Sequence, residues 1–247
     1  DRHLIPARKY GKWGFVNKQG DWIIPARYQQ AYHFSEGVAG VCQYGKWGFI
    51  DHTGSWVIPA RFSEAKPFSE GLACAMEHGR WGYIDHTGEW VIGPELQAIS
   101  SFSDGLALIG AETGYAFIDY RGERVIPRTY RRALPFAEGL AFVVHDRYKG
   151  YIDRRGHWVI RHDYEEAYSF SEGLALVRTD GLYGFINLTG ELAIDCVYED
   201  ANYFREGLAA VKVGVFWGYI DKSWRLVIEP RFESAQAFSE GHAVVRS

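Results

Sequence analysis

The chain has 247 residues, of which 47% are hydrophobic and 16% aromatic. This composition supplies a large packed core and excludes an intrinsically disordered chain. The formal net charge is −4 at pH 7, so no overall basic charge favours nucleic acid or an anionic lipid surface. No apolar run approaches the roughly 20 residues that a membrane-spanning helix needs. We therefore expect no nucleic acid partner and no membrane insertion.

A unit of 34 residues repeats along the chain. Seven units occupy residues 10–247 (Tyr10 to Ser247) without insertion or deletion. A fixed period of this length is typical of solenoids, propellers and arrays, and we predict a single domain over residues 1–247. The turn glycine of the unit recurs without exception at Gly37, Gly71, Gly105, Gly139, Gly173, Gly207 and Gly241.

Within the unit that begins at Gly37, three short apolar runs cover residues 38–42, 46–50 and 55–59. Aromatic and β-branched runs of this length, bounded by turns, are typical of β-strands. Residues 51–54 form an Asp-x-x-Gly turn, in which the Asp side chain can accept turn amides and the Gly takes a left-handed conformation. The Gly after each Trp, such as Gly48, indicates the close approach of a neighbouring backbone.

Both faces of the predicted hairpins are apolar. Trp13 and Phe15 share one face and Val16 lies on the other, which favours sheets stacked face to face. Further along the unit, Phe62, Ala65 and Phe68 follow one another at a spacing of three. This spacing is consistent with a fourth edge strand or with a turn of 3₁₀ helix. The whole pattern predicts an all-β fold of small antiparallel sheets.

The ends of the chain indicate how the array is completed. The first unit begins at Tyr10 and lacks a run of the 38–42 type, whereas the last unit ends with such a run at residues 243–247. We predict that this C-terminal strand joins the N-terminal sheet in one blade, which gives a closed seven-bladed β-propeller. Residues 1–9 are either a remnant of a preceding unit or an extra edge strand. An open β-repeat solenoid is the alternative, although it would require polar end caps.

A Trp-Gly motif recurs along the chain in a fixed context. Phe or Tyr-Ile-Asp follows, then Gly-x-x-Val-Ile-Pro and Phe-Ser-Glu-Gly-Leu-Ala, over essentially the whole chain. This motif resembles the bacterial WG-repeat (KWG-repeat) family. The resemblance implies a bacterial origin and an interaction module, often joined to other domains, and it supplies no activity. Trp13-Gly14, Trp47-Gly48, Trp81-Gly82 and Trp217-Gly218 match outright, Tyr183-Gly184 and Lys149-Gly150 match in part, and Tyr115-Ala116 departs at both positions.

Two repeated residue types allow a binding or a structural interpretation. The carboxylates could attract a cation or a basic partner, but we favour a role as acceptors for the amides of their own turns. The tryptophans could offer stacking platforms for sugars or bases, but we favour packing between blades. The carboxylates are Glu36, Glu70, Asp104, Glu138, Glu172, Glu206 and Glu240, with Asp51, Asp85, Asp119, Asp153 and Asp221 in a second column. The tryptophans are Trp13, Trp47, Trp81 and Trp217, with Trp22, Trp56, Trp90 and Trp158.

Basic residues concentrate between Arg128 and His162, where eight Lys and Arg residues stand against three Asp and Glu residues. The predicted strand order places one group toward one end of the fourth and fifth blades, and Arg154 and Arg155 at the other end. We predict that the first group docks an acidic surface, because such patches speed and orient association. A solvated rim is the alternative. The group consists of Arg131, Arg132, Arg147, His145 and His162.

Trp224 departs from the turn pattern. It stands where other units place the turn glycine, as at Gly20, Gly54 and Gly88. We therefore predict that it is exposed at a hairpin tip and contacts a partner.

The cysteines Cys42, Cys74 and Cys196 occupy three different positions of the unit. No repeated disulfide or metal knuckle is therefore expected, and we interpret these residues as reduced thiols. The sequence has no zinc-ligand spacing, nucleophile elbow, phosphate-binding loop or dinucleotide fingerprint. We expect no cofactor, no metal site and no catalytic residue.

These features predict a non-catalytic repeat scaffold that binds another protein or a peptide through one end face of a propeller. A propeller that binds a small ligand or carbohydrate is the alternative, and would require aromatic and polar groups that converge on a pocket. An enzyme with an axial site is the third hypothesis. We expect a monomer or part of a larger multidomain chain. The lack of a signal peptide and the unpaired cysteines favour the cytoplasm, with an exported bacterial protein as the alternative.

Overall fold

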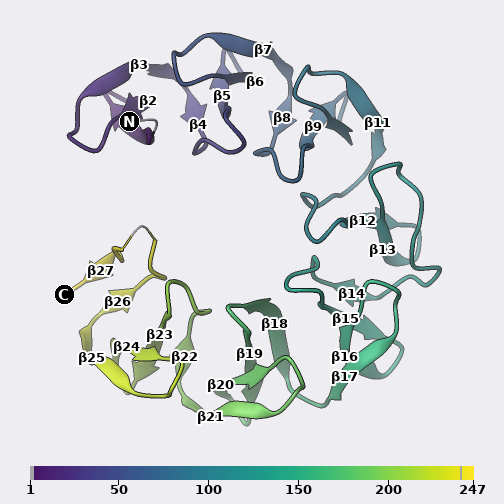
Figure 1. Ribbon diagram of the computed structural model, residues 1–247, viewed down its shortest axis with the longest axis vertical. Coiled ribbons are helices and arrows are strands. Elements are labelled where there is room, and N and C mark those ends of the chain that lie inside the picture. Colours follow the sequence, from purple (N-terminus) through teal and green to yellow (C-terminus); the bar gives the residue numbers. More distant parts are fainter. Residues whose placement is uncertain (1–2, 240) are drawn as a thin grey trace. The chain divides into compact units, whose positions relative to one another are not determined.

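The computed structural model describes residues 3–239 and 241–247, and the regular elements within them are all β-strands. The chain divides into two compact units, residues 1–129 and 130–247. Figure 1 labels the strands of each unit. The first unit contains β1 (Ile5–Lys9), β2 (Lys12–Val16), β3 (Trp22–Tyr28), β4 (Gln30–Ala31), β5 (Ala39–Gln43), β6 (Lys46–Ile50), β7 (Trp56–Phe62), β8 (Glu64–Ala65), β9 (Ala73–Glu77), β10 (Arg80–Ile84), β11 (Trp90–Leu96), β12 (Ala107–Ala111) and β13 (Gly114–Ile118). The second unit contains β14 (Arg132–Ala133), β15 (Ala141–His145), β16 (Tyr148–Ile152), β17 (Trp158–His162), β18 (Glu166–Ser171), β19 (Leu174–Thr179), β20 (Leu182–Asn187), β21 (Leu192–Tyr198), β22 (Asp200–Ala201), β23 (Leu208–Val213), β24 (Phe216–Asp221), β25 (Leu226–Phe232), β26 (Ser234–Ala235) and β27 (Val245–Arg246).

Small antiparallel sheets recur along both units, as the period predicts. The complete sheets have four strands in sequence order, namely β4–β7 and β8–β11 in the first unit and β14–β17, β18–β21 and β22–β25 in the second. The first strand of each complete sheet lies at one edge, and four of these five edge strands have only two residues. Glu64 and Ala65, for example, pair with Met76 and Ala75. The segment with a spacing of three therefore contains a fourth edge strand and not a 3₁₀ helix.

The strand pairing in the first sheet differs from our prediction for the ends of the chain. β1 pairs with β2 so that Ile5 lies opposite Val16, which is the relation of Ala39 to Ile50 in β5 and β6. Residues 1–9 therefore supply an edge strand, β1, which was one of our two predictions for them. In the first sheet, β1 takes the position beside β2 that we had predicted for the C-terminal strand. The C-terminal strand β27 pairs with β26. A tight turn at residues 10–11, both at positive φ, makes the β1–β2 hairpin local, and local closure costs little entropy.

A β-bulge explains the glycine of the Trp-Gly pair. In β6 and β7, Trp47 pairs with Phe62 and Phe49 with Ile58, so three residues of β7 face Gly48 alone. A Cβ atom on Gly48 would lie 2.5 Å from the Ile58 carbonyl oxygen, so only glycine fits beneath the bulge. This confirms the predicted close approach of a backbone. The same contact recurs at Gly14, Gly82, Gly184 and Gly218.

Two of the three units that depart from the Trp-Gly pattern lose this bulge. Ala116 replaces the glycine in the fourth repeat, and there β12 and β13 form a sheet of only two strands within the described residues. The segment after β13 keeps a single bridge, between Ile118 and Arg124. In the fifth repeat, Lys149 and Gly150 pair in simple register with His162 and Arg161. The unit with Tyr183 and Gly184 keeps the bulge, because Tyr183 pairs with Tyr198 and Phe185 with Ile194. Replacement of the Trp alone by Tyr therefore leaves the pairing of the third strand unchanged.

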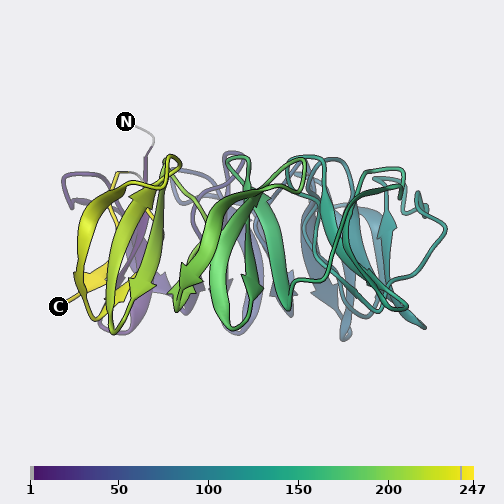
Figure 2. The ribbon, with the colours of Figure 1, turned by 90° about the horizontal axis from the view of Figure 1, so that it is seen from below.

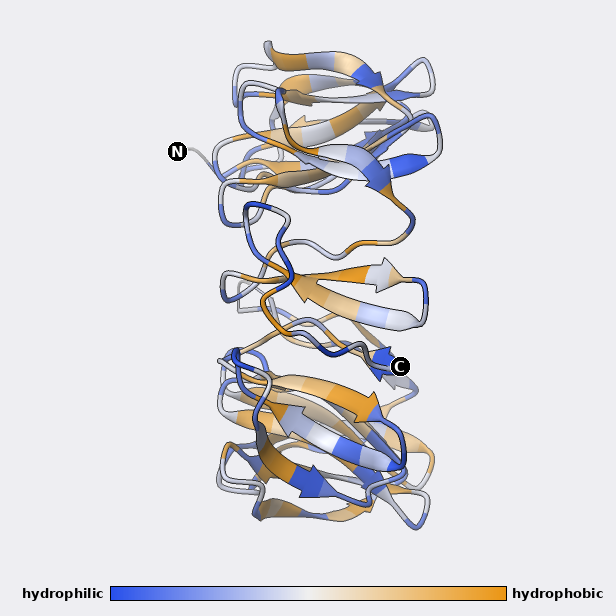
Figure 3. Ribbon diagram, turned by 90° about the vertical axis from the view of Figure 1, so that its right-hand side faces the viewer, coloured by the Kyte–Doolittle hydropathy of each residue, from blue (hydrophilic) through white to orange (hydrophobic). Residues whose placement is uncertain are grey.

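The core lies between successive sheets. Phe15 and Ile24 of the first sheet are buried in one cluster with Val41 and Ile50 of the next sheet. Within the second unit, sheets β18–β21 and β22–β25 stand side by side (Figure 2) and share a similar cluster. Apolar residues follow the strands and hydrophilic residues gather at the turns (Figure 3).

The tryptophans pack between repeats as predicted, but their exposed fractions differ. Trp47 is 7% exposed and belongs to the core. Trp56 packs edge-on against Tyr28 of the preceding sheet, with ring centroids 6.1 Å apart, but it remains 37% exposed. The tryptophans therefore join neighbouring repeats, and some of them also reach the surface.

Candidate functional site

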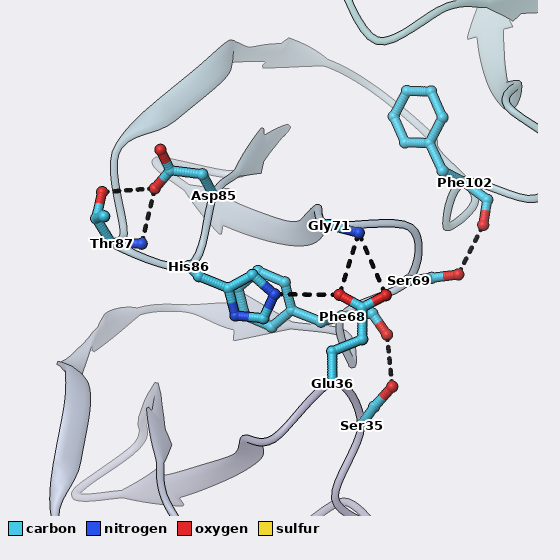
Figure 4. A network of polar contacts seen from close by, with 9 residues as sticks. All are labelled: Ser35, Glu36, Phe68, Ser69, Gly71, Asp85, His86, Thr87 and Phe102. Atoms are coloured by element: carbon cyan, nitrogen blue, oxygen red, sulfur yellow. Dashed lines mark hydrogen bonds and ion pairs between the residues drawn. The ribbon is translucent and has the colours of Figure 1, made fainter.

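The Asp of each Asp-x-x-Gly turn serves the turn itself. One carboxylate oxygen of Asp51 accepts the Thr53 amide at 2.8 Å, the Thr53 hydroxyl at 2.6 Å and the Ser55 amide at 3.1 Å. The hydrogen bonds from Thr53 lower the pKa of Asp51. Asp85 has the same contacts (Figure 4). The predicted structural role of this column is confirmed.

The Glu column makes a different contact from the one we predicted. The Glu36 carboxylate accepts the amide of Gly71, at 3.1 and 3.2 Å to its two oxygens (Figure 4). Gly71 lies in the turn of the following repeat, so the prediction of a bond to the same turn is wrong. The cause is that Glu36 and its equivalents stand at the junction between two sheets. The same bond joins Glu70 to Gly105, Glu138 to Gly173, Glu172 to Gly207 and Glu206 to Gly241, and Glu240 lies outside the described residues.

Further polar groups reinforce each junction. The Ser35 hydroxyl donates to the Phe68 carbonyl oxygen at 2.7 Å, and Ser69 repeats this bond to Phe102 at 2.8 Å. His86 lies 3.1 Å from a Glu36 carboxylate oxygen and stacks on the Phe68 ring with centroids 3.9 Å apart (Figure 4). The repeated polar residues are therefore engaged in holding one repeat to the next.

The predicted basic group gathers at one end of sheet β14–β17. Arg132 pairs with Val144 near the end of β15. His145 ends β15, and Arg147 lies in the turn that follows. The Arg147 guanidinium donates to the Tyr148 hydroxyl at 3.1 Å, and His145 lies 3.6 Å from Asp146. Among the described residues, Arg131, Arg132 and Arg147 form no ion pair with a carboxylate. The backbone pairing thus places these three arginines at one end of the sheet, with the Arg132 guanidinium over the Phe142 ring at 5.9 Å from its centroid.

His162 does not extend this basic surface. Its Nδ1 accepts the Tyr164 amide at 3.1 Å, and its ring lies among Phe142, Tyr151 and Tyr164. Burial, followed by the charge of Lys149, lowers the pKa of His162 to about 4. Its buried Nε2 has no hydrogen-bond partner within the described chain. His162 is therefore neutral near pH 7 and adds no charge to the surface.

Trp224 occupies the turn position in the left-handed conformation that glycine takes elsewhere, with φ 61°. Its indole nitrogen donates to the Tyr198 hydroxyl of β21 at 2.8 Å, and 42% of the residue remains exposed. The side chain thus lies against the preceding repeat and presents the rest of its ring to solvent.

A pocket of about 640 Å³ lies in the second unit, where sequence reasoning identified no site. Tyr168 and Tyr183 line it, and both of their hydroxyls donate to one oxygen of Glu166, at 2.6 and 3.3 Å. The Arg178 guanidinium bonds the other oxygen of Glu166 at 3.1 Å. The hydrogen bond from Tyr168, followed by Arg178, lowers the pKa of Glu166. Asp200, Asn202, Tyr203 and Arg205 also line the pocket.

A sequence signal for this pocket existed. Tyr203 and Arg205 depart from the residues that other repeats carry at the same positions. Arg205 replaces the small residue found at Ser35, Ser69, Ser103, Ala137, Ser171 and Ser239. Tyr203 replaces His33, Pro67, Ser101, Pro135, Ser169 and Ala237.

Two other pockets lie in the first unit. One of about 490 Å³ is the counterpart of the tyrosine-lined pocket, and in it Tyr32 stacks on Trp47 with ring centroids 4.8 Å apart. The other, of about 570 Å³, is lined in part by Glu95 and Thr113, near the irregular fourth repeat.

Three general findings concern other kinds of site. The described residues contain no cluster of His, Cys, Asp and Glu able to hold a metal ion. Among them, no helix has the length and apolarity to span a membrane. Cys42, Cys74 and Cys196 are free thiols, and burial raises the pKa of Cys74 to about 11.

Comparison with known proteins adds family and fold. A family model described as WG containing repeat matches residues 13–47, 47–81, 81–109, 115–147, 150–183, 183–214 and 217–247. No curated protein matches the sequence.

Solved structures of propellers resemble the chain at low sequence identity, which shows a propeller-like fold alone. A eukaryotic initiation factor has a TM-score of 0.66 at 11% identity, covering 96% of this chain and 76% of that one. Kluyveromyces marxianus Hsv2 has a TM-score of 0.53 at 10% identity, covering 91% and 92%. BamB from Moraxella catarrhalis has a TM-score of 0.52 at 16% identity, covering 85% and 76%.

Proposed function

Because the chain belongs to the WG-containing-repeat family, we propose that it is a non-catalytic scaffold that binds a protein or peptide with an acidic surface. The observation that carries this proposal is the group of uncompensated arginines at one end of sheet β14–β17. Arg131, Arg132 and Arg147 form this group, which we term the arginine cluster.

The repeated carboxylates form hydrogen bonds within the framework, so we assign binding to residues that vary between repeats. The Asp51 column closes turns, and the Glu36 column joins repeats. Both sets of carboxylates therefore accept hydrogen bonds from backbone amides of the framework. Specificity then falls to non-repeating residues on turns and sheet ends, as is usual for a rigid scaffold with variable loops.

The charge of the arginine cluster favours an acidic partner. The chain as a whole carries −4, so the cluster is a local positive feature on an acidic molecule. Guanidinium groups pair with carboxylates through two parallel hydrogen bonds, which fix orientation as well as attraction. A complementary acidic patch would associate faster and in a defined orientation, with a strong dependence on salt.

The scaffold is proposed to be a closed ring of seven blades, which the likeness to propeller structures supports. β1 pairs with β2 as β5 pairs with β6, and β27 pairs with β26 as β5 pairs with β4. β1 and β27 are therefore equivalent strands, and a complete closing sheet would use only one of them. Small-angle scattering of the whole chain tests closure, since an elongated profile would indicate the open array.

Charge reversal tests the binding proposal. The triple variant Arg131→Glu, Arg132→Glu and Arg147→Glu should lose partners that the unaltered chain captures from a native lysate. The matched control is Arg154→Glu with Arg155→Glu, since these residues lie in the turn between β16 and β17, at the other end of the same sheet. A captured protein is then purified and titrated at increasing salt.

The expected result is a loss of affinity of about tenfold or more in the triple variant and little change in the control. Affinity for the unaltered chain should also fall as salt rises. Equal affinity of all three proteins for the purified partner would refute the role of the arginine cluster.

A further inference from the structure

The geometry points to a saccharide site in the pocket between sheets β18–β21 and β22–β25, with a neutral sugar as its ligand. The site differs from the arginine cluster and does not depend on it. We term it the tyrosine pocket and define it by Tyr168, Tyr183, Tyr203, Asp200 and Arg205.

The two inner tyrosines of the tyrosine pocket are held in place. Their hydroxyls converge on Glu166, and Arg178 fixes Glu166 from the other side. The Arg178 guanidinium also lies over the Tyr183 ring, 5.5 Å from its centroid, and so covers one face of that ring. Rings held in this way lose little side-chain entropy when a ligand binds.

The equivalent groove in the first unit shows what distinguishes this site. There Tyr32 and Trp47 stack on each other, so each ring covers a face of the other. Among the described residues, Tyr168 and Tyr183 form no such stack with each other. Both rings are partly exposed and line the pocket without stacking on each other.

The residues at the mouth of the pocket are particular to this repeat. Tyr203 is 49% exposed and stands where the preceding repeat has Ser169. Arg205 stands where it has Ser171. In the described part of the chain the Arg205 side chain has no hydrogen-bond or ion-pair partner. An exposed ring and an unpaired guanidinium on a groove wall thus add two binding groups that the framework does not use.

The charges and polar groups indicate a neutral polyhydroxyl ligand. Arg205 would repel a cation, and Asp200 would repel an anion. A purely apolar ligand would leave these polar groups unsatisfied, which costs affinity. A sugar ring satisfies both requirements, since its C–H faces lie on the negatively polarised faces of aromatic rings and its hydroxyls donate and accept hydrogen bonds. A volume of about 640 Å³ is in the range of small-molecule pockets.

Titration with neutral disaccharides tests the site. Maltose, cellobiose and N,N′-diacetylchitobiose are titrated into the full chain, with saturation-transfer NMR and calorimetry as readouts. The test variant is Tyr203→Ser with Arg205→Ser. Serine occupies the equivalent positions of other repeats at Ser101 and Ser103, so this variant restores the framework residues and is expected to fold. Tyr44→Ser is the control, since Tyr44 is 90% exposed and does not line the pocket.

The expected result is that at least one disaccharide binds the unaltered chain and the Tyr44 variant, with affinity about tenfold lower or undetectable in the double variant. The reversal of the arginine cluster should leave this binding unchanged, which separates the two proposals. Absence of binding by all three sugars at about 10 mM, a concentration that would reveal even weak affinity, would overturn the inference. Equal binding to the double variant would overturn it as well.

Discussion

Replacement of the glycine in a Trp-Gly pair tests the packing that builds each repeat. In Gly48→Ala the new Cβ would lie 2.5 Å from the Ile58 carbonyl oxygen and 2.6 Å from the Ala60 amide nitrogen. Ordinary contact begins at 3.4 Å, so the bulge of β7 would have to move by about 0.9 Å, the difference from 2.5 Å. Both contacting atoms belong to the backbone, so no side-chain rotation relieves them.

The expected cost is about 2–3 kcal/mol of the free energy of unfolding. Overpacking of this kind costs about 1–3 kcal/mol, and lost pairing of β7 adds to it. The replacement of glycine also restricts the unfolded chain, which returns about 0.4–1 kcal/mol. In the fourth repeat, where Ala116 takes the place of the glycine, the third strand does not pair beyond one bridge within the described residues.

The assay is urea unfolding of the full chain, followed by tryptophan fluorescence, together with hydrogen exchange of the β7 amides. Gly45→Ala is the control, since Gly45 has φ +74° and its Cβ would meet nothing within 4 Å. That change should cost about 1 kcal/mol through the left-handed backbone alone. If Gly48→Ala is no less stable than Gly45→Ala and β7 keeps its protection, the account of the Trp-Gly motif is wrong.

Two further predictions concern stability. Glu36→Gln keeps the side-chain shape but weakens the charge-assisted bond to Gly71, so the free energy of unfolding should fall by about 0.5–1 kcal/mol in urea titrations. Glu77→Gln is its control, since that carboxylate makes no such bond within the described residues, and equal midpoints would contradict the expectation. Because the pKa of His162 is about 4 in the folded chain against 6.5 for an unperturbed histidine, the unfolded chain binds the proton first as the pH falls. Stability should therefore decline between pH 6.5 and 4, by about 2 kcal/mol after allowance for the partial exposure of the ring. Unfolding midpoints across this range should flatten in His162→Phe but not in His157→Gln, and an unchanged slope in His162→Phe would contradict the assignment.

Features that depend on neighbouring residues were predictable from the sequence. The Asp51 turn is closed by groups no more than four residues away, so its residue types determine its geometry. The period itself predicted a series of small antiparallel sheets, and the glycine of the Trp-Gly pair correctly indicated a close backbone.

Contacts between repeats could be decided only by the tertiary structure. Glu36 reaches an amide 35 residues along the chain, and no local rule distinguishes that amide from the one in its own turn. The tyrosine pocket arises because residues from different sheets meet across a groove, although Tyr203 and Arg205 already departed from the repeat. A repeating sequence determines which structural element recurs. Which side chains of neighbouring elements meet depends on how successive sheets are placed against each other, and that placement exists only in the folded chain.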